Sequence, residues 1–193
     1  MSDADVKPGA LTAGTAVLWV ATAALAAAAA ARVVLYGAFQ DAQFDACDAV
    51  FNASPTGNWP DDSSPCEQFS PMGWYLPYWG AVAAAVVFFA LLLAAAVGTG
   101  RGRQGARTLA AVSAPIAVAL WAVPGLLNLG WVFATAVAND ADSEVVEYLR
   151  DHFPSWFGTG ETALQIVFIA AAAVALWLLY RPEVGAWLRR GEQ

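Results

Sequence analysis

Long apolar stretches alternate with shorter polar ones along the chain. Four stretches contain no Asp, Glu, Lys, Arg or His, namely Pro8–Ala31, Gln68–Gly100, Thr108–Ala138 and Thr162–Tyr180. A helix rises 1.5 Å per residue, so roughly 20 apolar residues cross a hydrocarbon core about 30 Å thick. The pattern predicts an all-α, four-span transmembrane helical bundle, a single integral membrane domain with spans at about 10–31, 76–98, 109–136 and 162–180.

The basic residues predict how these spans are oriented. Seven of the nine lie in the N-terminal segment, the loop between the second and third spans, and the C-terminal tail: Lys7, Arg101, Arg103, Arg107, Arg181, Arg189 and Arg190. Positive charge beside a span end stays in the cytoplasm. We therefore expect a multi-pass protein of the cell membrane with cytoplasmic N- and C-termini and outer loops at about 32–75 and 139–161.

The charge balance of the segments agrees with this orientation. The outer loops hold two bases and twelve acids, a net charge of −10, whereas the inner segments sum to +3. The acids thus account for the overall charge of −7, as solvated residues of two exposed loops. An acidic outer face without a basic stripe excludes nucleic acid as a partner.

The first apolar stretch could be a signal peptide, because one lysine precedes an alanine-rich run. The run is longer than a usual signal-peptide core, and Arg32 ends it where a small-residue cleavage site would stand. We expect a retained first span. The small side chains of residues 23–31 would let neighbouring helices approach closely.

Both cysteines, Cys47 and Cys66, fall in the first outer loop. A pair of cysteines in one loop outside the cytoplasm most often forms a disulfide. A catalytic thiol pair would more commonly show the Cys-x-x-Cys spacing, whereas here 18 residues separate the two cysteines. The sequence predicts a structural disulfide.

Aromatic residues cluster in and beside the two outer loops. Trp and Tyr near span ends are typical of the membrane boundary, but Phe39, Phe44, Phe51 and Phe69 suit an apolar interior. A short amphipathic helix is also expected over Asp142–Phe153. We infer that the two outer loops, which are loops 1 and 3 of the three that connect the spans, fold into a small disulfide-stapled cap. The alternative is a loop that lies loosely on the lipid surface.

The third span contains helix-breaking residues and an amide. Its stretch is longer than the bilayer requires, and Pro115 and the pair Pro124-Gly125 are possible kink sites. Asn128 follows one turn later. A proline-broken span with a polar amide is similar to the broken helices that line transporter cavities. The alternative is a tilted helix in which Asn128 bonds to a neighbouring span.

Residues with catalytic chemistry are few. His152 is the single histidine and stands beside Asp151, where it is a weak candidate for a proton carrier. Gln165 is the other amide well within a span. The sequence contains no metal-ligand spacing, nucleotide loop or nucleophile elbow, so we expect no metal and no cofactor.

Three functions remain open. The first is a non-catalytic accessory, assembly or scaffold component of a membrane complex, whose partners are the lipid bilayer and a membrane protein or a second copy of the chain. The second is a small-molecule or lipid carrier that uses the proline-broken third span. The third is a membrane-embedded enzyme acting at the outer leaflet. The missing catalytic motifs favour the first.

Overall fold

The structure is a computed structural model that describes residues 7–53, 72–127, 148, 151 and 155–190. The described segments are helical: α1 (Gly9–Val34), α2 (Tyr36–Ala53), α3 (Met72–Gly100), α4 (Gln104–Ala117), the π-helical turn η2 (Val118–Ala122), α5 (Val123–Leu126), α8 (Ser155–Leu179) and α9 (Pro182–Arg190). Among the described residues, four helical segments are long and apolar enough to cross a membrane: Gly9–Val34, Tyr78–Gly100, Gln104–Leu126 and Trp156–Leu179. The predicted all-α fold with four spans is confirmed.

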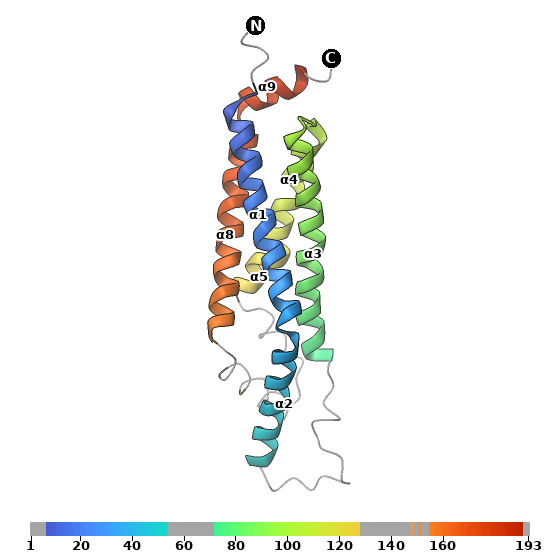
Figure 1. The fold of residues 1–193 in the computed structure, drawn as a ribbon, viewed down its shortest axis with the longest axis vertical. Coiled ribbons are helices and arrows are strands. Elements are labelled where there is room, and N and C mark those ends of the chain that lie inside the picture. The colour runs from blue at the N-terminus through green and yellow to red at the C-terminus, as the bar shows by residue number, and fades with distance from the viewer. Residues whose placement is uncertain (1–6, 54–71, 128–147, 149–150, 152–154, 191–193) are drawn as a thin grey trace.

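The spans stand side by side as a bundle (Figure 1). Helix α1 packs against both α3 and α8, and α3 packs against α4. The third span, made of α4, η2 and α5, reaches α8 mainly through η2 and α5. Helix α9 lies across one end of the bundle, and α2 extends from the other. We call these the α9 end and the α2 end.

Small residues and regularly spaced leucines fill the interior of the bundle. Leu11, Leu18 and Leu25 recur every seven residues along α1, and all three are fully buried. An added Cβ at Gly14 would lie 3.1 Å from the side chain of Leu179, so α1 and α8 are in close contact. Helices in lipid associate chiefly through such van der Waals packing, which explains the many alanines among the buried residues.

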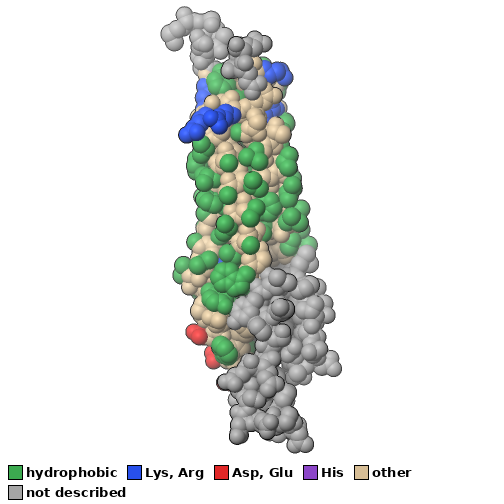
Figure 2. Space-filling view, turned by 90° about the vertical axis from the view of Figure 1, so that its right-hand side faces the viewer, with side chains coloured by type: hydrophobic (Ala, Val, Ile, Leu, Met, Phe, Trp, Pro, Cys, Tyr) green, Lys and Arg blue, Asp and Glu red, His purple; other side chains and the backbone are tan. Residues whose placement is uncertain are grey.

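Charge and apolar side chains divide the visible surface into zones. In Figure 2, Lys and Arg side chains gather near the α9 end, Asp and Glu appear at the opposite end, and hydrophobic side chains cover the length between them. Large apolar residues such as Val87, Leu120 and Val167 are exposed on the spans. A bilayer would cover them, because an apolar helix face suits hydrocarbon.

The third span changes its helical pitch between two prolines. After Pro115 in α4 the chain enters the wide turn η2, where the Val123 amide donates to the Val118 carbonyl five residues back. Pro124 follows and has no amide hydrogen to donate. The third span thus contains a π-helical turn over Val118–Ala122, between its two prolines, and such turns are often found at functional sites. Its widened backbone alters which side chains face α8.

The structure describes the side chains of two of the four phenylalanines that were expected in the apolar interior of a cap. Phe39 is buried and its ring stacks on Tyr78 at 4.5 Å, whereas Phe44 is 59% exposed, so its assignment to an apolar interior was wrong. The reason is that Tyr36–Ala53 forms a helix, which turns Phe44 away from the face that holds Phe39. Most of the segment 142–153 lies outside the described residues, and its two described positions, 148 and 151, are helical.

Candidate functional site

A buried amide lies where the broken third span meets α8. Gln165 is only 1% exposed, and its side chain lies directly against Gly125 of α5. A Cβ at position 125 would come within 1.8 Å of Gln165 Nε2 and 2.7 Å of Cδ. Glycine is therefore required at 125 for this amide to occupy its place. We call Gln165, Gly125, Trp121 and Phe168 the amide site.

Two aromatic rings form the apolar wall of the amide site. Trp121 of η2 and Phe168 of α8 are buried and meet edge to face, with ring centroids 5.5 Å apart. Phe168 follows Gln165 by three positions, so both side chains share one face of α8. The edge-to-face arrangement holds the π-helical turn in a defined position against α8.

The amide oxygen of Gln165 has no hydrogen-bond partner among the residues that the structure describes. A buried acceptor without a donor costs about 1–3 kcal/mol, so a donor that reached this oxygen would be held firmly. The group is neutral and can accept a hydrogen bond from a hydroxyl, an amide or water. The amide site can therefore bind and orient a donor, but it offers no acid or base.

A polar cluster joins three spans at the α2 end. Arg32 of α1 contacts the Glu161 carboxylate of α8 through Nε at 3.0 Å and through Nη2 at 2.5 Å. The Tyr78 hydroxyl of α3 donates to the Arg32 carbonyl, and Arg32 Nη1 donates to the Tyr78 carbonyl at 3.5 Å. Because the three side chains come from three helices, the cluster fixes the relative positions of those helices.

Aromatic rings extend this cluster towards α2. Tyr36 at the start of α2 packs on Tyr78 and Trp79, with centroid distances of 5.8 and 4.9 Å. Phe39 stacks on Tyr78 from one turn further along α2. The base of α2 is thus held against the start of α3, and the remainder of the helix extends beyond the bundle (Figure 1).

One face of α2 is exposed and acidic. Asp41, Phe44, Asp45 and Asp48 are exposed and recur at helical spacing, whereas Ala46 and Cys47 are buried on the other side. An exposed phenylalanine between aspartates offers an apolar contact surrounded by negative charge. We call these four residues the acidic face of α2.

The predicted site residues are only partly brought together. Gly125 contacts Gln165, and Pro124 precedes Gly125 in α5, just after the π-helical turn. Cys47 is buried in α2, while Cys66, Asn128 and His152 lie outside the described residues. Within the described part of the chain, no group of three His, Cys, Asp or Glu residues could hold a metal ion.

Sequence reasoning missed the pairing of Arg32 with Glu161, which it assigned to separate outer loops. The positions of these two residues in the sequence could have indicated the pairing. Arg32 directly follows the first uncharged stretch, and Glu161 directly precedes the fourth. A helix often continues a turn beyond its apolar segment, so charges at adjacent span ends can face each other. No protein-family model, curated protein or solved structure matches this chain.

Proposed function

We propose that this chain is a non-catalytic, four-span protein of the cell membrane that serves as an accessory, assembly or scaffold component. Both termini would be cytoplasmic, and the α2 end would face outwards. The observation that carries the proposal is the acidic face of α2, which exposes Phe44 on a helix outside the spans. Its occupant would be a membrane protein with a basic outer surface.

The chemistry of this face supports a protein partner. Asp41 and Asp45 stand beside the exposed ring of Phe44, so a partner could gain apolar contact and charge pairing together. The base of α2 is packed through Phe39 and Tyr78, which keeps the face in a defined position. A preorganised surface loses less entropy on binding than a mobile loop does.

A disulfide between Cys47 and Cys66 would strengthen the same region. Cys47 lies on the buried side of α2, opposite the acidic face. A bridge across the 18 intervening residues would restrain the chain that follows α2, by about 3 kcal/mol in the chain-entropy account. The acidic face would then remain exposed while the other side of α2 is covered.

Site-specific photocrosslinking in native membranes tests the proposal. A photoreactive amino acid at Phe44 should give one stoichiometric adduct, and Asp41→Asn with Asp45→Asn should reduce its yield several-fold. The same amino acid at Val87, which is exposed on a span, serves as the matched control. Absence of an adduct specific to position 44, together with a monomeric chain in mild detergent, would contradict the proposal.

A carrier is the second candidate, favoured by the unpartnered oxygen of Gln165 beside the π-helical turn. The amide site would accept a hydrogen bond from a small molecule or a lipid that enters between the third span and α8. Asn128→Leu and Gln165→Leu should each abolish transport in proteoliposomes while expression stays normal. Retained transport in both variants would exclude this use of the site.

A further inference from the structure

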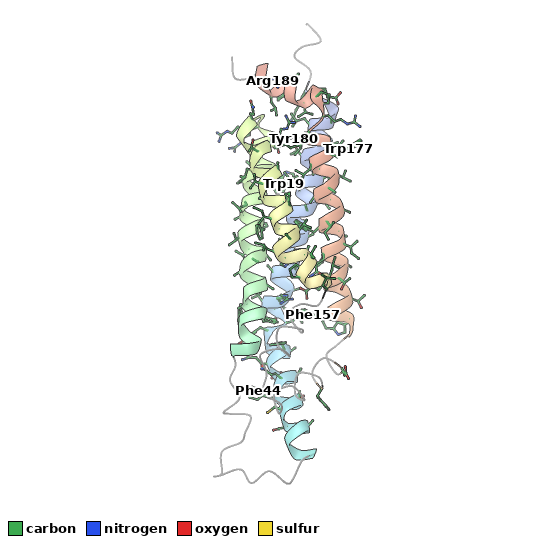
Figure 3. The ribbon with its side chains drawn as sticks, turned by 180° about the vertical axis from the view of Figure 1, so that it is seen from behind. Trp19, Phe44, Phe157, Trp177, Tyr180 and Arg189 are labelled. Atoms are coloured by element: carbon green, nitrogen blue, oxygen red, sulfur yellow. The ribbon has the colours of Figure 1, made fainter. Side chains whose placement is uncertain are left out.

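Two arginines stack on aromatic rings near the end of α8. The Arg107 guanidinium of α4 lies 4.0 Å from the ring centroid of Tyr180, and Arg181 lies 4.2 Å from the ring of Trp177. Figure 3 shows Trp177 and Tyr180 near the end of α8, close to α9, where Arg189 is labelled. We call the two arginines and their two rings the stacked corner.

Stacking uses the face of a guanidinium and leaves its edge available. The N–H donors of arginine lie in the plane of the group and match two oxygens of a phosphate. Within the described part of the chain, neither Arg107 nor Arg181 forms an ion pair, and Arg107 Nε is buried without an acceptor. The stacked corner therefore has oriented donors that lack an anionic partner.

Helix α9 holds the corner in place. Val184 and Leu188 are fully buried, so this short helix rests its apolar side on the end of the bundle. At Gly185 an added Cβ would lie 2.9 Å from Arg107 Nη1, which shows how closely α9 approaches the guanidinium. Because α9 packs on one side of Arg107 and Tyr180 on another, the orientation of this arginine is restricted.

The position of the corner indicates its ligand. Trp177 and Tyr180 are 61% and 49% exposed at the end of a span, where such rings sit at the headgroup layer. Further bases surround the same end, with Lys7, Arg101, Arg103 and Arg189 all exposed. A zwitterionic headgroup would bring its own cation into this positive field, whereas an anionic headgroup would not.

We propose that the stacked corner binds the phosphate of an anionic phospholipid, with Arg107 and Arg181 as its ligands. The exposed neighbouring arginines attract anionic lipid from a distance, but the two stacked arginines make the specific contact. The proposal does not depend on a partner at α2, because the two surfaces lie at opposite ends of the bundle.

Thermal unfolding of the full chain in nanodiscs tests the proposal. Replacing phosphatidylcholine by 30% phosphatidylglycerol should raise Tm by at least about 3 °C, because a ligand of the folded state stabilises it. Arg107→Gln with Arg181→Gln should remove most of that rise. The matched control, Arg101→Gln with Arg103→Gln, removes the same charge from exposed positions and should retain the rise.

Three other results would each contradict specific binding of an anionic phospholipid by the stacked corner. An equal loss in both double variants would overturn the proposal, because diffuse attraction would then explain the effect. A similar rise from inorganic phosphate in phosphatidylcholine would overturn the assignment to a lipid. If Arg107→Gln prevents folding, the single variant Arg181→Gln should show about half of the rise in Tm that phosphatidylglycerol gives the wild type. A rise equal to that of the wild type would overturn the proposal.

Discussion

Arg32 on α1 and Glu161 on α8 form an ion pair between positions 129 residues apart in the chain. Their side chains are each 17% exposed, so the pair is largely withdrawn from water at the end of two spans. The hydroxyl of Tyr78 on α3 binds the Arg32 carbonyl, and the ring of Tyr78 lies 5.3 Å from the guanidinium. Each charge thus has a specific partner, and the contacts link three of the four spans.

Removing one member of this pair should cost more than removing both. Glu161→Gln or Arg32→Met leaves one partly buried charge without its partner. We expect each to lower the free energy of unfolding by about 2 kcal/mol, between the values typical of exposed and of fully buried pairs, because both side chains are 17% exposed. The double variant Arg32→Met with Glu161→Met should recover part of that loss, because no unpaired charge remains. Thermal unfolding in one detergent provides the measurement.

Arg103→Met serves as the control for this prediction. Arg103 is exposed at the α9 end and makes no ion pair within the described residues, so its loss should change stability by less than about 0.5 kcal/mol. Strictly additive losses at Arg32 and Glu161 would show that the two charges do not stabilise the fold through each other.

The contact between Gly125 and Gln165 leads to a second prediction. Gly125→Ala places a Cβ 1.8 Å from Gln165 Nε2, so either the amide or α5 must shift. We expect a loss of about 1–3 kcal/mol, as for other overpacked interiors. Gln165→Ala in the same chain should restore most of the loss, because the shorter side chain vacates the space.

The control for Gly125 is Gly80→Ala on α3. Nothing lies within 4 Å of a Cβ at position 80, so alanine there should leave stability unchanged or raise it by up to about 1 kcal/mol. Equal effects at the two glycines, measured by thermal unfolding, would contradict the close contact between the third span and α8.

The spans could be predicted from the sequence because an uncharged stretch of about 20 residues has few other uses in a folded chain. The helix α2 could not be predicted so readily. Its aspartates and glutamines marked Tyr36–Ala53 as a loop, yet its many alanines are good helix formers. Composition gave the charge of this segment but not its backbone conformation.

Contacts between spans required the structure. Pro124 and Gly125 marked a break, but a single sequence does not give the rotation of the third span relative to α8, which places Gln165 against Gly125. Arg32 and Glu161 were separated by the rule that assigns every charge to a loop. The rule fails there because a partly buried partner of opposite charge lets a charge remain within a helix that continues past its apolar stretch.

The predicted disulfide has a direct chemical test. Intact mass spectrometry of the purified chain should show no alkylation by iodoacetamide under denaturing, non-reducing conditions, and two added groups after reduction. We also expect reduction to lower Tm, because a bridge across the 18 intervening residues contributes about 3 kcal/mol. Cys47→Ser with Cys66→Ser is the control and should show no response to the reductant. Alkylation without reduction would disprove the bridge.

The orientation of the bundle can be tested with two engineered thiols in a Cys47→Ser, Cys66→Ser background. Asp41→Cys lies on α2, Gln104→Cys lies at the start of α4, and both positions are exposed. Because the bases predict a cytoplasmic α9 end, an impermeant maleimide should label intact cells at position 41 and not at 104. Permeabilised cells should label at both, which shows that each thiol is reactive. Labelling at 104 alone in intact cells would reverse the topology and place the acidic face of α2 in the cytoplasm.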